Sequence, residues 1–114
     1  MGLGDSNDRS TFEEVTLMKN ERIISILGGW AHCVALTGLY FYSNLFKFKL
    51  HQEKGEIYSW GNNGNGQLGI GTTNKELIPC KVSIEESIIS IACGDNHTIA
   101  LSSNLFLKYF KYLK

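Results

Sequence analysis

The sequence lacks several features by which large classes of protein are recognised. Its formal net charge is zero and it contains no basic block, so the composition gives no support to nucleic-acid binding. No apolar stretch approaches the ~20 residues of a membrane span, and the N-terminus has neither the basic nor the apolar region of a secretory signal. The three cysteines show no Cys-x-x-Cys spacing, which argues against a disulfide framework or a metal site and is typical of a reducing compartment, cytoplasmic or nuclear.

Helical periodicity is absent as well, and glycine is concentrated between residues 59 and 74. Within that stretch Gly64–Gly69 reads Gly-x-Gly-x-x-Gly, the pattern of a dinucleotide or kinase phosphate loop. A dinucleotide loop needs a helix directly after its last glycine, because the helix N-terminus binds the pyrophosphate. Residues 70–79 contain a glycine, two threonines and Pro79, which do not begin a helix, and no Walker or kinase motif occurs. We therefore expect no nucleotide and no other cofactor.

The glycine pattern recurs because the chain repeats itself. Residues 23–36 match residues 88–101 at an offset of 65, and residues 1–4 match residues 68–71 at an offset of 67. Repeats of this length that read as short strands and turns predict a propeller or a solenoid. The strands are expected at about 23–28, 32–37, 55–60, 78–83, 88–93 and 97–102.

These repeats resemble the regulator of chromosome condensation repeat, whose unit is one blade of a seven-bladed β-propeller. The resemblance rests on Gly55–Gly61, Asn63, Gly66–Gly69, Gly71, Pro79, Val82, Cys93, Gly94, His97, Thr98, Ala100 and Leu101. It spans one full repeat and most of a second. It implies an all-β fold of antiparallel four-stranded blades, here an incomplete propeller over residues 1–102.

Most of the repeated residues are expected to have a structural role. Aromatic and branched side chains such as Trp60 would fill the space within and between blades. His32 and His97 stand at equivalent places, and a hydrogen bond that fixes a loop explains a duplicated histidine better than a general base or a metal ligand. The structural set is Gly29, His32, Trp60, Gly61, Gly66, Gln67, Gly69, Gly71, Pro79, Gly94 and His97.

Two stretches depart from the repeat, and both begin at the same point in it. They are an insert at residues 38–52 and a basic, aromatic tail at residues 103–114. Residues 39–51 and 105–114 contain no acidic residue and are rich in Phe, Tyr, Lys, Leu and Asn, a composition that favours translated non-coding sequence. The alternatives are a hairpin extension for the insert and, for the tail, a short segment that lies on anionic lipid.

For function, the resemblance implies a non-catalytic protein–protein interaction module, with Trp30, Asp95 and Asn96 as candidate partner contacts. No catalytic residue is assigned, because adjacent glutamates are more often solvated loop charges than an acid/base pair. Ser102, Ser103 and Cys33 have no base partner by motif. One alternative is guanine-nucleotide exchange on a small GTPase, the founding activity of the family. Another is light sensing, since Gly29–Cys33 is similar to the Gly-Trp-Arg-His-Thr motif of a plant ultraviolet-B photoreceptor. Here, however, Ala31 replaces the arginine whose cation would pack against indoles.

So few blades leave apolar faces and strand edges without a neighbour. Repeat proteins draw their stability from contacts between adjacent units, and three or more units are usually needed. We therefore expect the isolated chain to be marginally stable, or to associate with missing blades or with itself.

Overall fold

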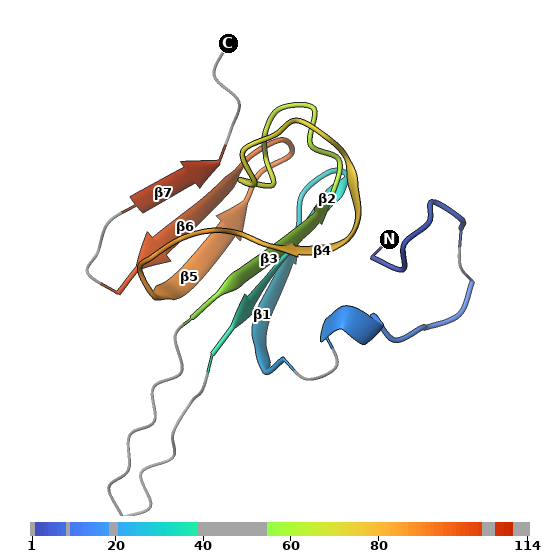
Figure 1. Ribbon diagram of the computed structural model, residues 1–114, viewed down its shortest axis with the longest axis horizontal. Coiled ribbons are helices and arrows are strands. Elements are labelled where there is room, and N and C mark those ends of the chain that lie inside the picture. Colours follow the sequence, from blue (N-terminus) through green and yellow to red (C-terminus); the bar gives the residue numbers. More distant parts are fainter. Residues whose placement is uncertain (1, 9, 19–20, 39–54, 104–106, 111–114) are drawn as a thin grey trace, which may run out of the picture.

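The chain forms two antiparallel β-sheets in the computed structural model, which describes residues 2–8, 10–18, 21–38, 55–103 and 107–110 (Figure 1). The first sheet is a meander of β1 (Ile23–Gly28), β2 (His32–Thr37), β3 (Ile57–Gly61) and β4 (Glu76–Lys81). The second contains β5 (Ile88–Cys93), β6 (Thr98–Ser102) and β7 (Leu107–Phe110). A short 3-10 helix, η1 (Thr16–Met18), precedes β1, and no described helix is long and apolar enough to span a bilayer. The predicted all-β fold, one four-stranded blade and part of another in an incomplete propeller, is confirmed.

Three strands have the predicted bounds, and the others shift by one or two residues. The largest change is in β4, which begins at Glu76 instead of residue 78. This strand lies at the edge of its sheet, and its register with β3 is interrupted between Ser59 and Gly61. Pro79 lies in the interrupted part, where an edge strand tolerates a residue that has no N–H to donate.

The repeat in the sequence is also a repeat in the backbone. The β1–β2 and β5–β6 hairpins have the same pairing, and each has a register shift near its first residue. The amide of Gly38 donates to the carbonyl oxygen of Arg22 (3.1 Å), and 65 residues later the amide of Ser103 donates to that of Ser87 (2.8 Å). The offset of 65 therefore relates two nearly identical local structures.

Part of the C-terminal tail forms a strand that the sequence did not predict. The backbone of β7 pairs with β6 as β3 pairs with β2, so that Phe110 is opposite Thr98 just as Trp60 is opposite Cys33. A segment without the family motif thus takes the third-strand position of the second blade. Apart from Gly38, the insert at residues 38–52 lies outside the described residues.

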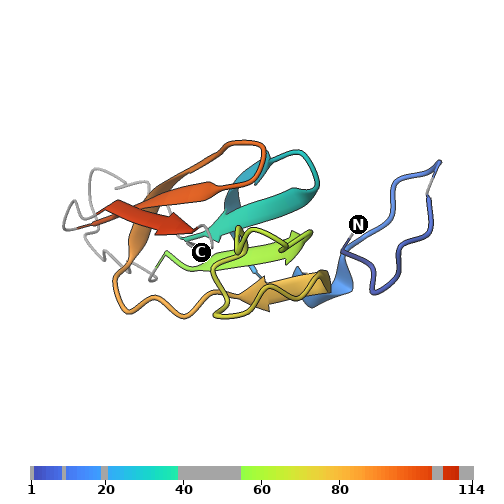
Figure 2. The same cartoon turned by 90° about the horizontal axis from the view of Figure 1, so that it is seen from above.

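The main core lies between the two sheets, which lie side by side with β5 next to β1 and β2 (Figures 1 and 2). Its buried members are Val34, Leu36, Ile57, Val82, Ile88, Ile91 and Ala100. A second, smaller cluster covers the opposite face of the first sheet, where Met18 of η1 packs with Ala35 and Trp60. The segment before β1 thus shields part of the outer face of the first sheet.

Equivalent isoleucines differ sharply in exposure because the described residues form only one interface between blades. Ile91 and Ile88 of β5 face the first sheet and are 9% and 3% exposed. Their counterparts in β1, Ile26 and Ile23, are 60% and 39% exposed. The same side chains are buried or exposed according to the presence of a neighbouring sheet.

This difference predicts unequal effects of two equivalent substitutions. We expect Ile91→Ala to lower the free energy of unfolding by about 2–4 kcal/mol, because it leaves a cavity in the core. Ile26→Ala removes the same atoms from an exposed site and is expected to cost less than about 1 kcal/mol. Urea denaturation of both variants measures the difference, and equal losses would contradict the assignment of the core.

Candidate functional site

Three loops gather at one end of the two sheets, and we call residues 29–31, 62–75 and 94–96 the loop face (Figure 1). The first and third are hairpin turns between β1 and β2 and between β5 and β6. The amide of Trp30 donates to the carbonyl oxygen of Asp95 (3.1 Å), and the amide of Asn62 donates to that of Ala31 (2.8 Å). Backbone hydrogen bonds therefore tie all three loops together.

Each hairpin turn is closed by a glycine and a histidine three residues later. The amides of Gly29 and Gly94 donate to the carbonyl oxygens of His32 (2.9 Å) and His97 (3.0 Å). In both turns the imidazole ring lies directly on the glycine, so that a Cβ at either glycine would collide with it. At Gly29 a Cβ would also lie 2.6 Å from the carbonyl oxygen of Gly94. Glycine is required at both positions because the histidine ring lies against the backbone, and not because the backbone is left-handed.

His32 connects the first blade to the second. Its side chain is 1% exposed, and its Nε2 lies 3.0 Å from Oγ1 of Thr98 on β6. Burial, and secondarily the nearby His97, lower the pKa of His32 below its ordinary value of 6.5. The ring is therefore neutral at physiological pH, and one hydrogen bond joins the two sheets beneath the loop face.

The glycine-rich loop uses its own polar groups to hold its shape. Asn63 is fully buried, and its side chain accepts from the Leu68 amide (3.1 Å) and donates to the Thr72 carbonyl oxygen (2.8 Å). The buried Gln67 accepts from the Asn65 amide (2.9 Å). The backbone amides of Asn65 and Leu68 are thus bonded within the loop. The loop leads into β4 and not into a helix. The geometry that a phosphate-binding loop requires is therefore not present.

Positive φ angles explain four further glycines of the predicted structural set. They are Gly61, Gly66, Gly69 and Gly71, with φ of 107°, 70°, 70° and 81°. L-residues rarely adopt this conformation, so these positions favour glycine. Gly2 and Gly4, which match Gly69 and Gly71 in the sequence, have φ of 87° and 90°. The repeat thus extends to the first described residues of the chain.

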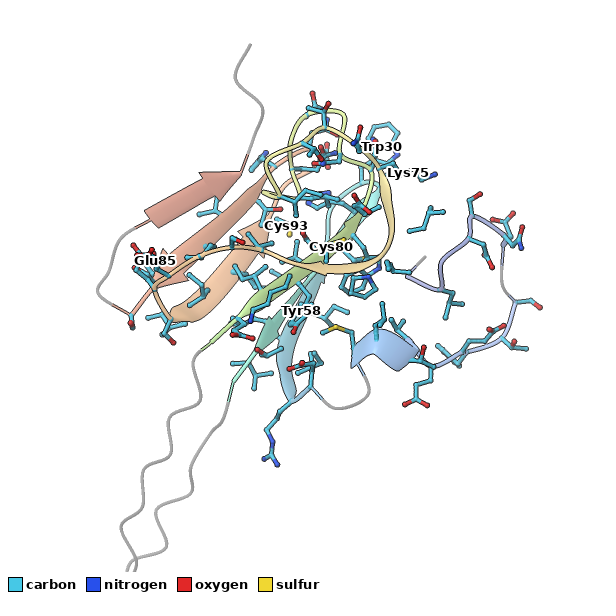
Figure 3. All side chains as sticks on the ribbon, in the orientation of Figure 1. Trp30, Tyr58, Lys75, Cys80, Glu85 and Cys93 are labelled. Carbon is cyan, nitrogen blue, oxygen red and sulfur yellow. The ribbon has the colours of Figure 1, made fainter. Side chains whose placement is uncertain are left out.

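The candidate partner contacts come together on the loop face. Trp30 is 81% exposed, and Asp95 and Asn96 are exposed on the neighbouring turn. Lys75 lies at the same end of the molecule, at the close of the glycine-rich loop (Figure 3). Trp60 and Pro79, by contrast, are buried in β3 and β4 and take no part in this surface.

The described residues contain no group of three His, Cys, Asp or Glu side chains that could hold a metal ion. Burial is the main factor that raises the pKa of Cys33, Cys80 and Cys93, so these thiols remain protonated and are poor nucleophiles. Cys93 packs against the core between the sheets (Figure 3). The part of the chain that the structure describes therefore shows nothing catalytic.

Two features of this end of the molecule were not predicted from the sequence. One is the contact of His32 with Thr98. The spacing of residues in the sequence does not reveal this contact, because the two residues lie on different sheets. The other is a cavity of about 390 Å³ beside β4, lined in part by Asp5, Asp8, Lys75 and Glu76. It forms because the N-terminal segment lies along β4, where the Gly4 amide donates to the Leu77 carbonyl oxygen (3.0 Å).

Gly29 in the first hairpin turn and Gly64 in the glycine-rich loop should differ in how well they tolerate a side chain. We expect Gly29→Ala to lower the free energy of unfolding by about 1–3 kcal/mol, since its Cβ would displace His32. Gly64→Ala is the matched control, because the nearest atom to its Cβ is 3.9 Å away and its φ is not positive. It should stay within about 0.5 kcal/mol of the wild type in chemical denaturation. A loss at Gly64 as large as the loss at Gly29 would contradict this steric explanation.

The lowered pKa of His32 makes stability depend on pH. The unfolded chain takes up this proton at higher pH than the folded chain, so the stabilisation is present above 6.5 and is lost as the pH falls through 6.5 towards the folded pKa. Urea midpoints between about pH 7.5 and pH 5 should fall less steeply for His32→Gln than for the wild type. His97→Gln, in the equivalent turn, should retain most of the pH dependence, because burial is the main cause of the lowered pKa of His32 and His97 is only the second. An unchanged slope in His32→Gln would disprove this origin of the dependence.

The chain is similar to several known proteins. The Regulator of chromosome condensation (RCC1) repeat matches residues 54–101. The Ultraviolet-B receptor UVR8 of Arabidopsis thaliana is 34% identical over 106 residues, which are 91% of this chain and 21% of that protein. The E3 ubiquitin-protein ligase HERC2 of Homo sapiens is 32% identical over 106 residues, which are 91% of this chain and 2% of that protein.

A solved structure shows the same arrangement of strands. The crystal structure of human WBSCR16 matches with a TM-score of 0.59 and 25% identity, over 77% of this chain and 19% of that one. The chain thus spans about a fifth or less of the length of these relatives. Since the repeat sequence, the meander of strands and the solved relative agree, residues 54–101 are a repeat of the regulator of chromosome condensation family, and the β1–β2 hairpin has the same pairing as the β5–β6 hairpin at an offset of 65.

Proposed function

We propose that the chain is a non-catalytic protein–protein interaction module whose partner binds at the loop face. Family membership supports the general role, since repeats of this type mediate protein interactions. The observation that carries the specific proposal is the exposed Trp30 at the tip of a turn whose backbone is held by a neighbouring blade.

Trp30 has the properties of an interaction hot spot. Tryptophan is enriched among the few residues that supply most of the binding energy in protein interfaces. An 81% exposed indole buries a large apolar area only when a partner covers it. Because the Trp30 amide is already hydrogen-bonded to Asp95, little backbone order would have to be created on binding.

The residues around Trp30 are suited to the rim of such an interface. Asn62, Lys75, Asp95 and Asn96 are exposed and polar, and they carry charges of both signs. A polar rim around an aromatic centre is the usual composition of a non-obligate interface. The chemistry therefore favours a folded protein partner over a strongly charged polymer.

Two alternatives use the same surface and have less support. Guanine-nucleotide exchange on a small GTPase would require residues that distort a nucleotide site, and no described residue is specific to that task. Light sensing is suggested by the name of the Ultraviolet-B receptor UVR8. Here Trp30 is exposed, Trp60 is 4% exposed, and Ala31 stands where the photoreceptor motif has arginine.

The proposal predicts that Trp30→Ala abolishes most partner binding. Proteins captured from a lysate by the wild-type chain should be identified, and the strongest should be titrated against purified variants. Loss of a hot-spot residue is expected to cost about 2 kcal/mol or more, or roughly a 30-fold increase in Kd. Phe12→Ala is the control, because Phe12 is fully exposed but lies outside the loop face.

The outcome separates the three functions. Binding that is lost in Trp30→Ala and retained in Phe12→Ala supports the interaction module. Equal binding by both variants contradicts a site at Trp30. Accelerated nucleotide release from a panel of purified small GTPases would replace the proposal with exchange activity.

A further inference from the structure

The pair of sheets has two outer faces, and each carries exposed aliphatic side chains. We call the exposed Ile23 and Ile26 of β1 the leading face, and Ile89 of β5 with Ile99 and Leu101 of β6 the trailing face. Ile23, Ile26 and Ile89 are 39%, 60% and 48% exposed, and Ile99 and Leu101 are partly exposed.

The interface inside the chain shows how two such faces fit. The first sheet contributes Ile24, Val34 and Leu36, and the second contributes Ile88 and Ile91. Val34, Leu36 and Ile88 are each at most 3% exposed, so the contact excludes water. In this internal interface, the side of the first sheet that faces β5 packs against the side of the second sheet that faces β1 and β2.

Each residue of this internal interface has a counterpart, 65 residues away in the sequence, on one of the two outer faces. Ile24, Val34 and Leu36 correspond to Ile89, Ile99 and Leu101 of the trailing face, and Ile88 and Ile91 correspond to Ile23 and Ile26 of the leading face. All five positions keep a branched aliphatic side chain. Except at Ala35, the counterpart of Ala100, which Met18 of η1 already covers, the chain thus presents both partners of an interface that it already forms once.

The hydrogen bonds between blades can repeat in the same way. Trp30 donates through its amide to Asp95, and His32 meets Thr98. In a second contact, Asp95 of one copy would face Trp30 of the next, and His97 would face Cys33. A thiol is a weaker hydrogen-bonding group than a hydroxyl, so this contact would be weaker than the internal one.

We propose that copies of this chain associate head to tail, with the trailing face of one copy on the leading face of the next. The interface is heterologous, because the two faces are different surfaces of the same chain. Such contacts form a ring if the rotation closes and an open stack if it does not. The hairpin turns of every copy would then lie on the same side, which places several Trp30 side chains along one surface.

The test uses the full chain and two charge substitutions, one on each face. Ile26→Glu blocks the leading face and Ile89→Glu blocks the trailing face, and both sites are exposed enough to leave the fold intact. Analytical ultracentrifugation should show oligomers larger than dimers for the wild type. Each variant alone should be monomeric, with self-association weakened about tenfold or more. An equimolar mixture should form a 1:1 heterodimer, because one intact face remains on each variant.

Several results would overturn the proposal. They are a monomeric wild type, assemblies that both substitutions leave unchanged, and a mixture that stays monomeric. If either glutamate variant fails to fold by circular dichroism, Ile26→Ser and Ile89→Ser replace them with the same expectations. No other protein is present in this experiment, so its failure leaves the partner site at Trp30 unaffected.

A substitution that should strengthen self-association tests the proposed register between the leading and trailing faces. Cys33→Thr gives the leading face the hydroxyl that His32 meets on Thr98 within the chain. We expect self-association to tighten, by up to about tenfold if the new hydrogen bond forms. Unchanged or weaker association of a folded Cys33→Thr chain would overturn the proposed register.

Discussion

The contact between the two sheets is the constraint on which the rest of the structure depends. Neither sheet could bury its aliphatic side chains alone, because each is a single layer with two faces. When Val34 and Leu36 meet Ile88 and Ile91, the adjacent hairpin turns are brought within hydrogen-bonding distance. The surface that carries Trp30 is therefore a product of the core and not of the turns themselves.

The two hydrogen bonds above this core have a different role from the core itself. Hydrophobic burial is not directional, and it would allow the sheets to slide relative to each other. The bond from Trp30 to Asp95 and the contact of His32 with Thr98 fix one relative position. Glycine at residues 29 and 94 is required for this, because the turns must be thin enough for the histidine rings to lie against them.

Much of the fold could be predicted from the sequence because its strands and glycines occur twice. Alternating aliphatic residues and paired turn glycines located β1, β2 and β5 to the residue. The residues after Gly69 also correctly predicted that no helix follows, since the chain there leads into β4. The strand β7 could not be predicted, since its pairing with β6 uses backbone groups and its side chains carry no family motif. The link from His32 to Thr98 was also beyond reach, because it depends on how two sheets pack.

The connection between β2 and β3 is closed at its base by Thr37, the last residue of β2, and Glu56, the residue before β3. The Thr37 amide donates to the Glu56 carbonyl oxygen (2.9 Å), and the Glu56 amide donates to Oγ1 of Thr37 (3.2 Å). Ser102, which is fully buried, occupies the corresponding position in the second blade. The entropic cost of closing a loop rises only slowly with its length. A connection closed at its base by these hydrogen bonds should therefore tolerate added residues. Because β2 and β3 pair in register beyond this connection, we expect it to be a suitable place to graft a peptide epitope or a tag.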